Sequence, residues 1–157
     1  MFDYIIVHTD GEYEIAANLF GEYAAWLNID LAFQKFDEEL AALKTMYGAP
    51  GGGIILCKTG NEFIGCVAVR RINDSTAELK RMFVQTAFQG KGIGKILLEK
   101  AIELAENAGY HCIRLDTLNY MLPAISLYKQ YGFYEIPAYY HNPNETAVYF
   151  ELQIVRS

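Results

Sequence analysis

Positive charge is scarce in this sequence. Its 157 residues include 13 Lys and Arg against 19 Asp and Glu, which gives a net charge of −6 at pH 7. A nucleic-acid-binding surface needs clustered Lys and Arg to neutralise phosphates, so we expect no nucleic-acid partner. The charge balance favours a cationic partner instead.

Long hydrophobic runs are also missing. No apolar stretch reaches the roughly 18 residues that a membrane-spanning helix needs. The first residues, Met1-Phe2-Asp3-Tyr4, lack the basic region and apolar stretch of a secretory signal. We therefore expect no membrane partner and predict a cytoplasmic location.

Cysteine is rare as well, and its spacing excludes the common metal motifs. Cys57, Cys66 and Cys112 are odd in number, far apart and set among apolar neighbours. No Cys-x-x-Cys or His-x-x-x-His spacing occurs, so we expect no metal site. Three buried thiols in a reducing compartment are the simplest interpretation.

The composition is that of one ordinary folded domain. The sequence is 52% hydrophobic and 20% charged, and it contains no internal repeat or low-complexity segment. A chain of this length can bury a substantial core. We therefore predict a single domain over residues 1–157.

Hydrophobic periodicity divides the chain into strands and helices. Strands are predicted at residues 2–8, 54–57, 63–71, 76–84, 111–116, 133–136 and 146–154. Helices are predicted at residues 10–20 with Asp10 as the N-cap, at 33–47, from 93 to about 107, and at 123–131. The glycines at 51–53 precede a strand and not a helix, so they are interpreted as a flexible strand entry.

Connection lengths then predict the topology. The three strands between residues 54 and 84 follow one another through short turns, which makes them antiparallel. The helix after residue 92 provides a crossover, so strands 76–84 and 111–116 should be parallel. The prediction is an α/β (α+β) fold with a mixed, mostly antiparallel sheet of six or seven strands, helices on both faces and a central parallel pair.

A glycine-rich loop before the third helix is hard to explain by folding alone. It contains three glycines at alternate positions in the run Gln89-Gly90-Lys91-Gly92-Ile93-Gly94-Lys95. Each glycine in a helical turn costs about 1 kcal/mol relative to alanine. A helix N-terminus free of side chains lets a phosphate approach the unpaired N–H groups, so the loop is a candidate anion site.

The spacing of the loop excludes two nucleotide-binding families. A Walker A loop needs Gly-Lys-Ser/Thr after four residues, and the dinucleotide fingerprint needs its third glycine one position later. The run instead resembles the Gln/Arg-x-x-Gly-x-Gly/Ala loop of the GNAT (GCN5-related) N-acetyltransferases, with Gln89, Gly92 and Gly94 at the defining positions.

A second segment supports the same resemblance. Residues 124–133 read Ala-Ile-Ser-Leu-Tyr-Lys-Gln-Tyr-Gly-Phe, similar to the Ala-x-x-Leu-Tyr-x-x-x-Gly-Phe element that closes the acetyl-CoA site in GNAT enzymes. Many family members have Asn three residues before the Ala; this chain has Met121 there and Asn119 two positions earlier.

The resemblance implies acetyl-CoA as cosubstrate and a primary amine, on a small molecule or a protein, as acceptor. It implies direct attack of the amine in a ternary complex. The backbone of the loop would hold the pyrophosphate, with charge from Lys91 or Lys95, and Tyr128 would protonate the leaving thiolate. The strand before the loop would align the pantetheine and thioester through the backbones of Met82, Phe83 and Val84.

The resemblance also suggests a base. Glu78 lies eleven residues before Gln89, the register of the basic glutamate in histone-type acetyltransferases. Strand alternation would place Lys80 and Met82 on the same face as Glu78. The alternative is a charge on an exposed face or a pairing with Lys80 or Arg70, and the sequence leaves both open.

Several further alternatives stay open. Tyr131 is a second candidate acid, His141 in the 139–144 loop is more simply a solvated residue than a substrate contact, and Asp116 and Thr117 end the parallel strand where ligands tend to bind. The acidic charge favours a cationic acceptor amine. Another acyl-CoA, a non-catalytic acyl-CoA sensor and a homodimer are all compatible with the sequence.

Overall fold

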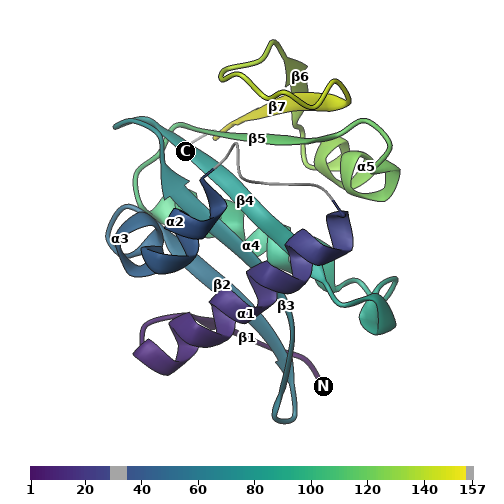
Figure 1. The fold of residues 1–157 in the computed structure, drawn as a ribbon. Coiled ribbons are helices and arrows are strands. Elements are labelled where there is room, and N and C mark those ends of the chain that lie inside the picture. Colours follow the sequence, from purple (N-terminus) through teal and green to yellow (C-terminus); the bar gives the residue numbers. More distant parts are fainter. Residues whose placement is uncertain (29–34, 155–157) are drawn as a thin grey trace.

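The computed structural model describes residues 1–28 and 35–154. They form a seven-stranded sheet in the order β1-β2-β3-β4-β5-β7-β6 (Figure 1). Its strands are β1 (Asp3–Ile6), β2 (Gly53–Thr59), β3 (Glu62–Arg71), β4 (Thr76–Val84), β5 (Cys112–Leu118), β6 (Tyr134–Ile136) and β7 (Ala147–Gln153). Each predicted strand is present, with ends that shift by a few residues.

The pairing pattern confirms the predicted topology. Strands β1 to β4 pair with their neighbours in antiparallel fashion, as do β5, β7 and β6. Only β4 and β5 are parallel. The crossover between these two strands is α4 (Ile93–Asn107), which begins directly after the glycine loop.

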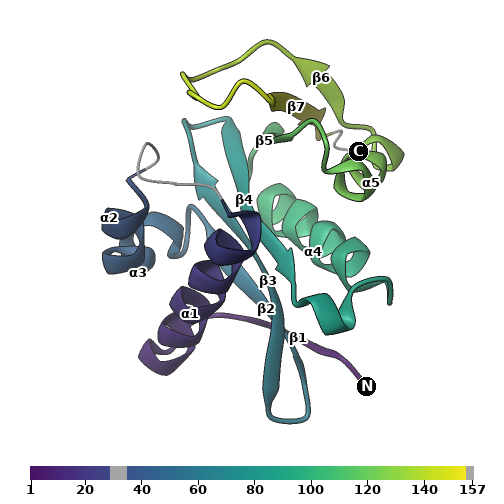
Figure 2. The ribbon, with the colours of Figure 1, turned by 45° about the vertical axis from the view of Figure 1, so that its right-hand side comes forward.

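Helices cover both faces of the sheet (Figure 2). Helices α1 (Asp10–Leu27), α2 (Phe36–Ala41) and α3 (Leu43–Tyr47) lie on one face. Helices α4 and α5 (Leu122–Gln130) lie on the other, and a short 3-10 turn (Thr86–Phe88) precedes the glycine loop. Two buried apolar clusters correspond to these two layers: one contains Leu97 of α4 and Tyr128 of α5, and the other contains Phe20 of α1.

Three details of the helices differ from the prediction. The N-cap of α1 is Thr9 and not Asp10, because the Thr9 hydroxyl accepts from the Glu12 N–H and the Glu12 carboxylate accepts from the Thr9 N–H. The helix continues to Leu27. The helix predicted at 33–47 is two helices, broken at Ala42 with φ −129°; its predicted start lies outside the described residues.

Gly52, directly before β2, is required for packing, which corrects the interpretation of residues 51–53 as a flexible entry. A Cβ on Gly52 would lie 2.4 Å from the carbonyl oxygen of Val69, and one on Gly53 would lie 2.5 Å from a methyl carbon of Leu104. The backbone contact leaves no room for a side chain at Gly52, whereas the end of the Leu104 side chain can shift. Gly52 and Gly53 are therefore closely packed against β3 and α4.

The burial of the three cysteines agrees with the prediction from the sequence. Cys57, Cys66 and Cys112 are buried free thiols. Within residues 1–28 and 35–154, every helix is too short or too polar to cross a bilayer. The same residues contain no group of three or more His, Cys, Asp or Glu side chains that could hold a metal ion.

Candidate active site

The candidate site lies where β4 and β5 separate. The two strands are paired only at their beginnings, where Thr76 is opposite Cys112 and Glu78 is opposite Arg114. Beyond these residues β4 and β5 no longer pair with each other, and the two strands diverge. This opening in the middle of the sheet is the position where open α/β sheets bind ligands.

A bulge in β4 shapes this opening. The pairing with β3 shifts register between Cys66 and Ala68, and Arg81 has φ 59°, a conformation that residues other than glycine rarely adopt. Beyond the bulge the alternation reverses, because Phe83 packs on the α1 face and Met82 toward α4. The expectation that Lys80 and Met82 share a face is therefore wrong at Met82.

A pocket of about 310 Å³ extends along the second half of β4. It lies between that strand, the glycine loop and the N-terminal part of α5, with the end of α1 at its rim. It is lined by Trp26, Met82, Phe83, Val84, Phe88, Gln89, Gly90, Gly92, Ile93, Gly94, Tyr120, Met121, Pro123, Ala124 and Leu127. The strand and loop residues predicted to bind acetyl-CoA are thereby brought together, except for the two loop lysines.

The backbone of the glycine loop has the form of an anion cradle. Gly90 and Gly92 have φ values of 80° and 82°, so their positions favour glycine. Gly92 is the N-cap of α4, and no side chain caps the helix. A Cβ on Gly94 would meet nothing within 4 Å. Free N–H groups and open space therefore coincide at the positive end of the helix dipole, which fits a pyrophosphate.

The polar side chains of the loop are arranged around this cradle. Gln89 donates from Nε2 to the carbonyl oxygen of Val84 at 2.9 Å and so fixes the loop to the end of β4. Lys91 and Lys95 are exposed beside the helix start. Their ammonium groups are free to approach a phosphate from solvent.

A second, smaller pocket adjoins the first. It lies between β4, β5 and the end of α1, and it shares Met82, Met121 and Ala124 with the larger pocket. Its other lining residues are Tyr23, Leu27, Leu79, Lys80, Arg81, Asp116, Thr117, Leu118, Tyr128, Asn142 and Asn144. We call the larger one the donor pocket and the smaller one the acceptor pocket.

Tyr128 lies at this junction. Its ring is 5% exposed and packs 5.6 Å from the ring of Phe133 and 6.5 Å from that of Phe150. Among the described residues, its hydroxyl makes no hydrogen bond. Burial raises the pKa of Tyr128, so the phenol is protonated at neutral pH and its proton is available to a ligand.

Glu78 is held within a group of polar side chains. Arg70 donates from Nε to Glu78 Oε1 at 2.8 Å, and Tyr139 donates to Oε2 at 2.6 Å. The Nζ atom of Lys80 lies 3.8 Å from Oε1. Burial would raise the pKa of this carboxyl, but the nearby Lys80 and Arg70 charges outweigh burial, so the pKa of Glu78 is lowered. Of the two roles left open by the sequence, the pairing with Arg70 and Lys80 is the one that these contacts show.

Asp116 ends β5 inside the acceptor pocket. Its Oδ2 accepts from the Tyr140 hydroxyl at 2.6 Å and from Asn142 Nδ2 at 3.4 Å. Tyr139, Tyr140 and Tyr149 contact one another edge to face. The 139–144 loop is therefore fastened to the pocket by two tyrosine hydroxyls, which bind Glu78 and Asp116.

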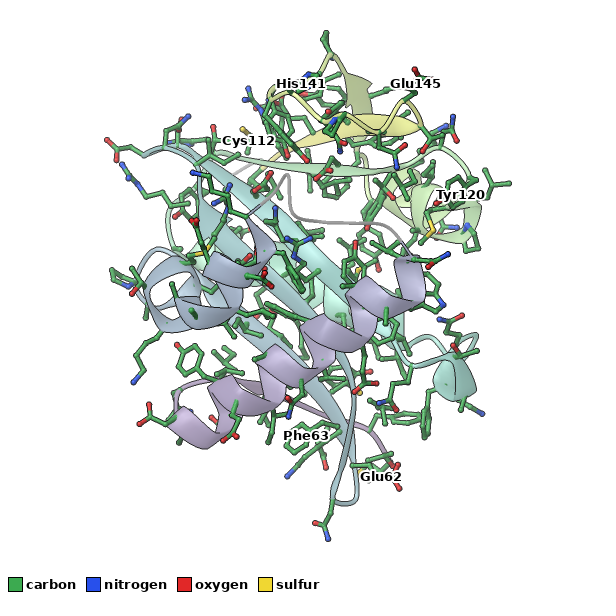
Figure 3. All side chains as sticks on the ribbon, viewed as in Figure 1. Glu62, Phe63, Cys112, Tyr120, His141 and Glu145 are labelled. Atoms are coloured by element: carbon green, nitrogen blue, oxygen red, sulfur yellow. The ribbon has the colours of Figure 1, made fainter. Side chains whose placement is uncertain are left out.

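Several candidates from the sequence lie outside both pockets. His141 is exposed on the connection between β6 and β7, and Figure 3 shows it on the outer edge of that connection. Tyr131 and Asn119 line neither pocket, whereas Met121 lines both. Met121 therefore supplies an apolar contact to both pockets.

Other residues of the site gave no clear signal in the sequence. Trp26, 41% exposed at the end of α1, and Tyr120, 55% exposed at the β5–α5 turn, line the donor pocket. Figure 3 shows Tyr120 beside α5. The helical spacing of Trp26 was visible in the sequence, but its position beside β4 depends on the packing of α1.

Comparison with known proteins identifies the family. A sequence model of the Acetyltransferase (GNAT) family matches residues 20–133, more than half of the chain, from Phe20 in α1 to Phe133 after α5. The chain belongs to the GNAT family. As a member it is an acetyl-CoA-dependent N-acetyltransferase, and the two motifs in the sequence that indicated this family are confirmed.

Individual relatives support the family assignment. An uncharacterized N-acetyltransferase of Schizosaccharomyces pombe is 37% identical over 135 residues, covering 85% of this chain and 83% of the relative. The human N-acetylaspartate synthetase is 35% identical over 106 residues, or 66% of this chain and 35% of that longer protein. A GNAT acetyltransferase of Elizabethkingia anophelis with acetyl-CoA bound superimposes with a TM-score of 0.69 at 25% identity, over 98% of both chains.

Proposed function

We propose that this protein transfers an acetyl group from acetyl-CoA to a primary amine by direct attack in a ternary complex. The observation that carries the proposal is the junction of the two pockets at Met82, Met121 and Ala124. Two ligands that meet there can react without a covalent enzyme intermediate. Tyr128 lines the acceptor pocket beside these residues.

The donor pocket would hold acetyl-CoA through backbone groups. The amides from Gln89 to Lys95 would bind the pyrophosphate, with Lys91 and Lys95 adding charge. The divergent part of β4 leaves backbone groups of Met82, Phe83 and Val84 without a partner on β5, and these would pair with the pantetheine like an extra strand. Trp26 and Tyr120 would cover its apolar portion.

The reaction balances with one proton at each end. The amine nitrogen bonds to the acetyl carbon, the carbon–sulfur bond breaks, the amine loses a proton and the sulfur gains one. A thiol of pKa about 8.5 leaves as a thiolate, and Tyr128 would donate the proton to it. Backbone N–H groups of β4 would polarise the thioester carbonyl.

Glu78 remains a candidate for the proton acceptor, directly or through water. Its three partners and lowered pKa favour a second role in this proposal, in which it holds Arg70, Lys80 and Tyr139 in place around the acceptor pocket. A carboxylate that lines the pocket directly is Asp116.

The relatives and the pocket indicate which amines should be tested as acceptors. The human relative is an N-acetylaspartate synthetase, so amino acids belong in the panel beside polyamines, lysine side chains and peptide N-termini. The free buried thiols support a reducing cytoplasm as the location. A homodimer is compatible with this scheme but is not required, because both pockets are formed by one chain.

The test is free-thiol release from acetyl-CoA across the amine panel, with wild-type protein, Tyr128→Phe and Tyr131→Phe. We expect turnover by wild type, a loss in kcat on the order of 10²-fold in Tyr128→Phe with unchanged acetyl-CoA affinity, and near-normal turnover in Tyr131→Phe. Full activity of Tyr128→Phe at all pH values would exclude Tyr128 as the acid.

The same assay decides the competing functions. If acetyl-CoA stabilises the protein but no amine is turned over, the result favours a non-catalytic acyl-CoA sensor. If a longer acyl-CoA is turned over faster than acetyl-CoA, the longer acyl-CoA is the donor. If acetyl-CoA neither stabilises the protein nor supports turnover of any amine, the proposal is overturned.

A further inference from the structure

Two arginine–glutamate ion pairs lie beside the acceptor pocket. Arg81 donates from Nε and Nη2 to the two carboxylate oxygens of Glu39, both at 2.9 Å. Arg70 donates to Glu78 at 2.8 Å. In both pairs the carboxylate is 2% exposed. The Arg81 side chain that pairs with Glu39 is 3% exposed, and the Arg70 side chain that pairs with Glu78 is 35% exposed.

Lys80 is the third cation of this group, and it makes no hydrogen bond to Glu78 or Glu39. Its side chain is 8% exposed and lines the acceptor pocket. The nearest carboxylate oxygen, Glu78 Oε1, lies 3.8 Å from Nζ, beyond hydrogen-bond distance, and already accepts from Arg70. Among the described residues Nζ donates no hydrogen bond. A buried ammonium in this state lacks the partners that normally offset its desolvation.

The charges facing Lys80 oppose one another. Burial lowers the pKa of Lys80 most strongly, and the nearby Arg81 lowers it further, whereas Glu78, Glu39 and Asp116 raise it. The pKa of Lys80 is lowered on balance. An anion bound beside Nζ would favour the charged form and supply the missing acceptor.

Asp116 is the carboxylate that lines the same pocket. Only its Oδ2 accepts hydrogen bonds from described residues, and no Lys or Arg within the described ranges lies within 4.0 Å of it. Lys80 comes from β4 and Asp116 from β5, which diverge at this point. One pocket therefore presents a cation and an anion that form no ion pair with each other.

We propose that the acceptor carries a carboxylate as well as its amine, with Lys80 binding the carboxylate and Asp116 attracting the amine as an ammonium ion. The inference rests on the proposed acetyl transfer and specifies its acceptor class as a small zwitterion such as an amino acid. The net charge of −6 favoured a purely cationic amine, but that value is summed over the whole sequence. The pocket itself contains Lys80 and Arg81 as well as Asp116.

The test compares matched acceptors on the full-length protein. Each amino acid in the panel is paired with its primary amide, which keeps the amine and the shape but removes the negative charge. We expect wild-type protein to prefer the acid at least about tenfold in kcat/KM, mainly through KM, because a charged hydrogen bond is lost with the amide. Lys80→Met should reduce this acid-to-amide ratio at least about tenfold.

Controls separate the inference from the proposed function. Lys58→Met removes a lysine on β2 outside both pockets and should keep the wild-type ratio. Asp116→Asn should raise KM for the acid and the amide together. Melting temperature and acetyl-CoA affinity of each variant report folding, and the wild-type comparison of acid with amide needs no variant.

The outcomes are distinct. No thiol release with any acid, amide or simple amine would overturn the proposed function. Equal turnover of acid and amide by wild type, or an unchanged ratio in Lys80→Met, would overturn the role of Lys80 while acetyl transfer stands. In that case Lys80 serves only to neutralise Glu78.

Discussion

Arg81 and Glu39 form a two-point ion pair that ties α2 to the bulge in β4. Both hydrogen bonds measure 2.9 Å, and the two side chains are 3% and 2% exposed. The guanidinium also lies over the rings of Tyr23 and Phe36. Because Arg81 is at the bulge with φ 59°, this pair holds β4 in the conformation that opens the donor pocket.

Glu39→Gln is expected to destabilise the protein strongly. The change keeps the shape of the side chain but leaves Arg81 buried without a counter-charge, which costs about 3–5 kcal/mol. Chemical denaturation measures the loss. The control is Glu38→Gln on the exposed side of the same helix, which should change stability by less than about 0.5 kcal/mol. A loss in Glu39→Gln no larger than in the control would show that the pair does not stabilise the bulge.

Gly94→Ala is expected to separate stability from ligand binding. Because the site has open space around Gly94 within α4, alanine should stabilise the free protein by up to about 1 kcal/mol. The new methyl group would occupy the space proposed for the pyrophosphate, so acetyl-CoA should bind at least about tenfold more weakly in calorimetry. Gly21→Ala in α1 also meets nothing within 4 Å and should stabilise without any change in binding. Equal acetyl-CoA affinity in both variants would place the pyrophosphate elsewhere.

Gly52→Ala tests whether the glycines before β2 are needed for packing. Its Cβ would lie 2.4 Å from the Val69 carbonyl oxygen, so we expect a loss of about 1–3 kcal/mol in the free energy of unfolding. The neighbouring Gly51→Ala would meet only ordinary contacts, the nearest at 3.5 Å from the Tyr110 hydroxyl, and should be close to neutral. If the segment were merely flexible, both alanines would stabilise the protein similarly.

Local motifs explain why so much was predictable from sequence. The glycine loop and the segment around Tyr128 each lie within about ten consecutive residues, so their spacing is visible directly in the chain. The directions of the strands between residues 54 and 116 followed from connection lengths, which are also local. These features predicted the sheet, the parallel pair and the donor pocket.

The acceptor pocket depends on contacts between distant residues. Arg81 and Glu39 are 42 positions apart, and Lys80 and Asp116 line one pocket only because β4 and β5 run in parallel. The bulge was equally hidden, since arginine has no preference for positive φ. It reverses the strand alternation, which is why the expected orientation of Met82 was wrong while that of Glu78 and Lys80 held.

Glu78 should make the stability of the protein depend on pH in the acid range. Burial opposes ionisation, but Lys80 and Arg70 lower the pKa of Glu78 below the ordinary value of 4.5. A carboxyl with a lowered pKa in the folded state stabilises the protein above the unfolded pKa, and this contribution is lost as pH falls through the folded pKa. The loss should therefore begin below about pH 4.5.

Glu78→Gln isolates this contribution. At pH 7 the variant should be less stable than wild type by roughly 3 kcal/mol, since Arg70 and Lys80 lose their counter-charge. The gap should narrow as pH falls below about 4.5, because the unfolded wild-type chain then takes up a proton at Glu78, whereas the lowered pKa keeps the folded state ionised. Urea denaturation at each pH measures it, with the exposed Glu62→Gln as the control for a charge change at the surface. A gap that stays constant across this range would mean that Glu78 stabilises the protein through its shape and hydrogen bonds, and not through its charge.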